Sequence, residues 1–170
     1  MIIMANRKIR PIRIEGNVAY VPLTRGYEAT IDAADVDLVS GFNWYAKPGG
    51  GTVYAARTDA ATNKTARMHT VVAPAPDGLV VDHIDGNGLN NCRKNLRHAT
   101  HIENCQNQRL AKNNASGFKG VSWHKARRKW IMQIAGGGKR IARYFDTPEQ
   151  ARDAYAKSSA ALHKEFGRIA

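Results

Sequence analysis

The sequence predicts an α+β fold built from short strands and few helices. Short runs of apolar and β-branched residues, separated by turns rich in Gly and Asn, recur along the 170 residues and are typical of small sheets. Two strong helix starts, at Thr100 and Thr147, each follow a group of predicted strands. With 43% hydrophobic residues the chain can bury a core, so it is not a disordered basic tail.

Residues 1–66 are predicted to form a β-rich region. Apolar residues over 12–21 predict a hairpin that turns at Glu15-Gly16-Asn17. A short helix is expected over 33–39, with Asp32 as its N-cap. Strands are predicted on both sides of a Pro- and Gly-rich loop at 48–51. This region holds no catalytic cluster, which favours a role as a packing scaffold.

Residues 67–110 are predicted to fold as strand, loop, strand and helix. The strand 78–81 leads into Asp82 and His83, and the polar loop 85–91 follows. A second short strand is expected at 95–98. The sequence from Thr100 to Glu103 is a T-x-x-E capping box, which predicts a helix that begins at about residue 101.

Residues 111–116 are small and polar and are predicted to be a linker. The remaining block, 117–170, is predicted to be a three-stranded antiparallel sheet packed on one helix, with strands at 118–124, 129–135 and 139–145. The helix is expected to start at Thr147 and Pro148 and to end near Gly167. Its sheet-facing side is predicted to comprise Ala151, Ala154, Tyr155, Ser158, Ala161 and Leu162.

The positive charge is concentrated at the C-terminal end. The chain carries 26 Lys and Arg against 14 Asp and Glu, a net charge of +12. Residues 1–110 carry a net +3, whereas 111–170 carry a net +9. Nine basic residues and no acid occur over 111–145, interleaved with aromatic residues. The interleaved aromatic residues predict that this segment folds, and the unmixed positive charge predicts that it binds a nucleic acid.

Asp82 and His83 are the candidates for chemistry. Neighbouring residues in a strand point to opposite faces, so one can bind a metal while the other faces a substrate. Asn104 follows in the first turn of the capped helix, and carboxylate and amide oxygens suit Mg²⁺. A neutral histidine beside such a site can deprotonate water, which outlines a phosphodiester hydrolase. An isolated Asp-His pair is more often structural, so the spacing alone leaves both interpretations open.

The segment 81–104 resembles the HNH endonuclease motif of phage and intron homing endonucleases. The matching parts are Val81 to Asn91, Asn95-Leu96-Arg97 and Thr100 to Asn104. The resemblance implies a ββα-metal nuclease module that hydrolyses DNA with one divalent metal, Mg²⁺ or Mn²⁺. It further implies that His83 is the general base and that Asp82 and Asn104 are the metal ligands. Asn95 would brace the loop and orient the base. His69, in an upstream Met-His element, would be a supporting residue. Thr70 stands where relatives carry arginine.

Residues 117–170 resemble the Apetala-two DNA-binding domain of plant ethylene-response factors, through stretches 116–123, 129–134 and 144–151. The resemblance implies that the sheet enters the major groove of double-stranded DNA. By strand alternation Trp130, Met132 and Ile134 face the helix and Gln133 faces outward, where it can read an adenine edge. Trp123 is expected in the core. The candidates for phosphate or guanine contacts are Lys119, Lys125, Arg127, Arg128, Lys129, Lys139, Arg140 and Arg143. Ser122 and Arg143 depart from the plant pattern, so the plant target does not transfer.

Several classes of protein are excluded by the sequence. No run of about 18 apolar residues exists for a membrane span, and the start lacks the apolar stretch of a signal peptide. Cys92, His98, His101 and Cys105 fit no common zinc spacing, and no small-molecule substrate is expected.

The sequence thus predicts a DNA-associated protein in the cytoplasm of a bacterium or phage-infected cell, and it leaves the oligomeric state open. The leading hypothesis is a homing-type, metal-dependent DNA endonuclease. The alternatives are a non-catalytic DNA-binding protein with a vestigial nuclease fold and, less favoured, an RNA-processing protein.

Overall fold

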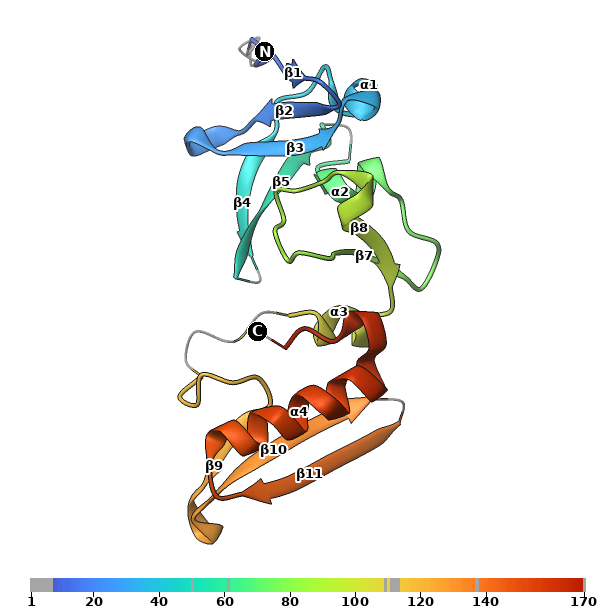
Figure 1. Cartoon of the computed structure of the whole chain (residues 1–170). Coiled ribbons are helices and arrows are strands. Elements are labelled where there is room, and N and C mark those ends of the chain that lie inside the picture. Colours follow the sequence, from blue (N-terminus) through green and yellow to red (C-terminus); the bar gives the residue numbers. More distant parts are fainter. Residues whose placement is uncertain are drawn as a thin grey trace. The chain divides into compact units, whose positions relative to one another are not determined.

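The computed structural model describes residues 8–49, 51–60, 62–108, 110, 114–136 and 138–169. The chain is divided into two compact units, one up to Ala99 and the other from Thr100. Small antiparallel sheets and short helices make up both units, which is compatible with the predicted α+β class (Figure 1). None of the described helices is long and apolar enough to cross a membrane.

The first unit contains two three-stranded antiparallel sheets. Their strands, in spatial order, are β1 (Arg13–Glu15), β2 (Val18–Pro22) and β3 (Glu28–Asp32), then β4 (Tyr45–Gly49), β5 (Thr52–Thr58) and β6 (Thr65–Arg67). The hairpin predicted at Glu15-Gly16-Asn17 is confirmed, and Gly16 adopts the positive φ of 57° that the turn requires. The predicted loop at 48–51 is shorter than expected, because Pro48 and Gly49 still pair with Val53 and Thr52.

The predicted helix over 33–39 is shorter than expected. A 3-10 turn at Ala33–Asp35 leads into α1 (Val36–Val39). The expected N-cap was wrong, since the side chain of Asp32 makes no cap hydrogen bond. Its Oδ2 instead accepts from the backbone N–H of Arg93 at 2.7 Å, a partner 61 residues away that sequence spacing could not reveal.

The core of the first unit lies between its sheets and the short helix α2 (Met68–Val72). Ile31, Val39, Trp44, Met68 and Val72 are almost completely buried. The indole Nε1–H of Trp44 donates to the carbonyl of Val39 at 2.9 Å, so the largest core side chain also has its polar atom satisfied. This core fixes α2, the helix that carries His69.

A separate hairpin carries Asp82 and His83. It consists of β7 (Val80–His83) and β8 (Leu96–Ala99), which pair so that Asp82 lies opposite Arg97 and His83 opposite Leu96. Both strands were predicted, as was the polar loop between them. The boundary between the two units falls directly after this hairpin.

The second unit begins with α3 (His101–Gln106), where the predicted capping box is confirmed: Thr100 and Glu103 each accept from the other's backbone N–H. The three predicted strands follow as β9 (Val121–His124), β10 (Lys129–Gly136) and β11 (Lys139–Phe145), in the order β11-β10-β9. The helix α4 (Pro148–His163) starts at the predicted Thr147 cap and covers one face of this sheet (Figure 1).

Three details of the second unit differ from the sequence prediction. The buried face of α4 includes Ser159 and His163 rather than Ala161, because His163 Nε2 donates to the carbonyl of Ala135 on β10 at 2.8 Å. The helix ends at His163, before the predicted Gly167, because Lys164 leaves the helical conformation with a φ of 49°. Trp123 is 47% exposed and not in the core, since β9 is an edge strand and its indole packs edge-on against Trp130.

Candidate active site

His83 and Asp82 lie at the end of β7, both buried in the first unit, with 6% and 5% of their surfaces exposed. Strand alternation sends their side chains to opposite faces of the hairpin. The carboxylate of Asp82 accepts from Nε of Arg97 at 2.9 Å and forms an ion pair with it. Arg97 therefore compensates a charge that would be costly to bury alone.

The hydrogen bonding of His83 defines its basic nitrogen. Asn91 is fully buried, and its Nδ2 donates to the carbonyl of Leu89, so its Oδ1 faces His83 Nε2 at 3.3 Å. A neutral ring therefore donates from Nε2 and carries its basic lone pair on Nδ1. Burial lowers the pKa of His83 and outweighs the opposing effects of Asn91 and Asp85, so the imidazole is neutral at neutral pH.

The structure brings the predicted supporting residue, His69, to His83. The two ring centroids are 4.8 Å apart and perpendicular, and the ring of Tyr54 lies within 6 Å of both. Burial, together with the proximity of His83 and Arg67, lowers the pKa of His69 to about 3. Its buried Nδ1 has no hydrogen-bond partner among the residues that the structure describes.

Asn95 spans the loop between β7 and β8. Its Nδ2 donates to Asp85 Oδ1 and to the carbonyl of Asn90, and its Oδ1 accepts from the backbone N–H of Asp85. Burial by itself would raise the pKa of Asp85, but hydrogen bonds from Asn87, Asn90 and Asn95 outweigh it and lower that pKa. An ionised carboxylate at the surface therefore accepts several hydrogen bonds that hold the shape of the loop.

The N-terminal sheets hold the same loop in place. Thr30 on β3 donates its N–H to the carbonyl of Leu89 and accepts from the N–H of Asn91. On β5, Thr52 accepts from the N–H of Gly88, and a Cβ at position 88 would lie 2.6 Å from the ring of Tyr54. The region predicted as a scaffold thus positions Asn91, and through it the ring of His83.

The two predicted metal ligands belong to different units. Asp82 lies in the first unit, whereas Asn104 lies on α3 in the second, where Thr100 and Glu103 cap the helix. No group of three or more His, Cys, Asp or Glu residues that could hold a metal occurs in the described part of the chain. Carboxylate and amide oxygens are each the hard donors that Mg²⁺ prefers, so the residue types agree with the predicted ligands.

The predicted DNA-contacting residues do not form one surface. Strand register places Lys129, Gln133 and Arg140 on the sheet face opposite α4, but Lys139 and Arg143 on the α4 side, opposite Gly136 and Met132. Lys125, Arg127 and Arg128 lie at the turn between β9 and β10.

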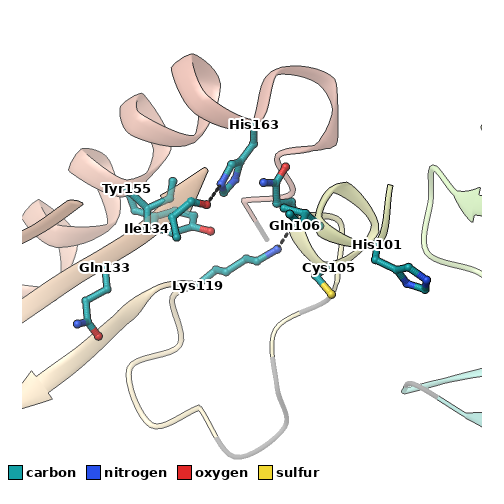
Figure 2. A pocket seen from close by; sticks show the side chains of 10 residues that line it. His101, Cys105, Gln106, Lys119, Gln133, Ile134, Tyr155 and His163 are labelled. Atoms are coloured by element: carbon teal, nitrogen blue, oxygen red, sulfur yellow. Dashed lines mark hydrogen bonds between the residues drawn. The ribbon is translucent and has the colours of Figure 1, made fainter. Parts of the chain in front are cut away.

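Lys119 interacts with α3 instead of pointing outward. Its Nζ donates to the carbonyls of Gln106 and Gln108 at 2.6 and 2.8 Å, at the C-terminal end of the helix, and burial lowers the pKa of the amine. It lines a cavity of about 400 Å³ together with Cys105 and Tyr155 (Figure 2). The amine thus stabilises the exposed carbonyls of α3.

Sequence reasoning missed four residues around the site. Asn91, Asp85 and Arg97 belong to the segment quoted for the HNH resemblance, and the pairing of Arg97 with Asp82 follows once the hairpin register is known. Tyr54 carried no signal, because its proximity to His69 and His83 depends on how β5 packs.

Comparisons with known proteins support the HNH resemblance of this part of the chain. The HNH endonuclease family model matches residues 71–106, a range that includes Asp82, His83, Asn95 and Asn104. Protein 3.8 of Escherichia phage T7 is 43% identical over 112 residues, which cover 62% of this chain and 92% of that protein. No solved structure gives a significant match. Residues 117–170 lie outside the family match.

Proposed function

This chain belongs to the family of the phage T7 Protein 3.8 and matches the HNH endonuclease family, and we propose that it is a homing-type, metal-dependent DNA endonuclease. The observation that carries the proposal is His83 itself. Its imidazole is buried and neutral, its Nε2 is held by Asn91, and its Nδ1 is the basic nitrogen. A histidine held in this way is suited to accept a proton near neutral pH.

In the proposed reaction, Nδ1 of His83 accepts a proton from a water molecule as its oxygen attacks the scissile phosphate. A new bond forms between that oxygen and phosphorus, and the bond from phosphorus to the leaving nucleotide oxygen breaks. Asn91 orients the base directly, while Asn95 braces the loop that carries Asn91. His69 and Tyr54 pack against the imidazole and restrict its rotation.

Asp82 and Asn104 would hold the divalent metal, Mg²⁺ or Mn²⁺. A metal bound there would stabilise the negative charge that develops on the phosphate and on the leaving oxygen. Arg97 keeps the Asp82 carboxylate oriented at the end of β7. The C-terminal sheet, with its surrounding basic residues, would bind the double-stranded target.

A non-catalytic DNA-binding protein is the second candidate. It is favoured by one observation, the ion pair between Asp82 and Arg97, which gives the carboxylate a structural role of its own. In that case the chain would bind DNA without cleaving it.

A plasmid-nicking assay separates the two candidates. Supercoiled DNA is incubated with the full chain in Mg²⁺, in Mn²⁺ and in EDTA, and with His83→Ala. His98→Ala is the matched control, because His98 is an exposed histidine on the neighbouring strand β8. Loss of a general base should slow nicking about 10²- to 10⁴-fold, whereas the control should cut normally. DNA binding without nicking in either metal would contradict the endonuclease.

A further inference from the structure

The sheet face opposite α4 has an uncharged central row at Gln133, with basic residues around it. Alternation along β10 places Ile131, Gln133 and Ala135 on this face, since Met132 and Ile134 pack against α4. Across the strands, Ser122 and Tyr144 lie opposite Ile131, Ala142 lies opposite Gln133, and Arg140 lies opposite Ala135. No charged residue therefore lies opposite Gln133, whereas Arg140 belongs to the neighbouring row.

Gln133 is the one amide in this central row among the described residues. Its side chain is exposed and extends away from the side occupied by Tyr155 and His163 (Figure 2). The two residues opposite it have the smallest side chains. Ala142 lies opposite on β11, and the carbonyl of Gly120, just before β9, accepts from the Gln133 N–H at 2.8 Å. Neither of these two neighbours has a bulky side chain that would prevent the edge of a base pair from approaching the amide.

The basic groups around this row are held in defined positions. The guanidinium of Arg127 lies 4.7 Å from the centroid of the Tyr144 ring, and that ring packs edge-on against His124. Lys129 Nζ forms an ion pair with Asp146 at 2.6 Å, which partly compensates its charge. Arg127 therefore lies beside the row of Ile131 and Tyr144, while no charged residue lies opposite Gln133.

We propose that the centre of this face recognises A·T base pairs in the major groove. The inference rests on the proposed function, because it requires that this sheet binds duplex DNA. The Gln133 amide pairs with N6 and N7 of adenine, and the Ala142 methyl group contacts the C5-methyl of a nearby thymine. Neither arginine nor lysine, the usual readers of guanine, lies opposite Gln133, so a G·C pair at this position is disfavoured.

The experiment begins with selection of binding sites from random duplex DNA by the full chain in EDTA, where binding is measured without cleavage. The selected duplex is then compared in fluorescence anisotropy with three derivatives. In the first, the A·T pairs of the core are replaced by G·C. In the second, thymine is replaced by uracil, which removes only the methyl group. In the third, adenine is replaced by 7-deazaadenine, which removes only the N7 acceptor.

The expected result is an A·T core in the selected sites and about tenfold weaker binding after its replacement by G·C. Gln133→Ala should lose the response to 7-deazaadenine, and Ala142→Gly should lose the response to uracil. Gln150→Ala is the matched control, an exposed glutamine of α4 on the opposite side of the sheet, and it should keep both responses.

Two results would overturn the proposal in distinguishable ways. Tight binding to selected sites that show no A·T preference, or an unchanged 7-deazaadenine response in Gln133→Ala, would refute A·T recognition while leaving the DNA-binding function intact. Failure to bind any duplex above the level of unrelated polyanions would refute the proposed function together with this inference.

Discussion

The buried His69 predicts an acid-sensitive first unit. Its pKa of about 3 lies below the ordinary value of 6.5 because burial, His83 and Arg67 disfavour the charged ring. The folded state therefore binds fewer protons than the unfolded state, and the stabilisation present above pH 6.5 is lost as the pH falls towards 3. Between pH 7.5 and 4.5 these two pKa values give a loss of about 2.5 kcal/mol in the free energy of unfolding.

The assay is urea unfolding at both pH values, followed through the indole N–H signal of Trp44 in NMR spectra. This proton is buried and bonded to Val39, so it reports on the first unit alone. His69→Phe keeps the packed ring but cannot titrate, and it should remove about 2.5 kcal/mol of the pH-dependent loss. The exposed His98→Gln is the control and should keep it. An unchanged pH dependence in His69→Phe would refute the reasoning.

Three further substitutions test the second unit. Gly120→Ala places a Cβ 2.2 Å from the Tyr155 ring. Gly117 has a similar positive φ but open space around it, so Gly117→Ala is the control. The free energy of unfolding should fall about 2 kcal/mol more in Gly120→Ala than in Gly117→Ala. Equal losses in thermal unfolding would contradict the clash. Thr100→Ala removes the capping box and should cost about 1 kcal/mol, whereas Thr100→Ser should match the wild type in the same assay. Lys119→Met removes two hydrogen bonds to the end of α3. Amide hydrogen exchange in this part of the chain should become about tenfold faster, which corresponds to about 1.4 kcal/mol. An unchanged exchange rate would show that the amine does not stabilise the helix end.

Local signals in the sequence were sufficient for most of the secondary structure. The capping box at Thr100, the Gly16 turn and the Thr147-Pro148 helix start depend on residues a few positions apart, and all three occur as predicted. Strand alternation likewise placed Gln133 outward and Met132 inward.

Features that depend on tertiary packing could not be predicted. The hydrogen bond from Arg93 to Asp32 joins residues 61 positions apart, and the exposure of Trp123 follows from its place on an edge strand. In the candidate site, His83 and Asp82 were found from their motif. Tyr54 was not, because only the folding of β5 against the loop brings it to the two histidines.

Chemical rescue of His83→Gly most directly tests the central claim that this imidazole is the general base. The variant should nick plasmid DNA at a strongly reduced rate, and added imidazole should restore the rate in proportion to its unprotonated fraction. Imidazole should not rescue Asp82→Asn, whose proposed role is to hold the metal. If His83 is the general base, imidazole rescues the first variant alone. Full activity of His83→Gly without imidazole, or a reduced activity that imidazole leaves unchanged at every pH, would contradict it.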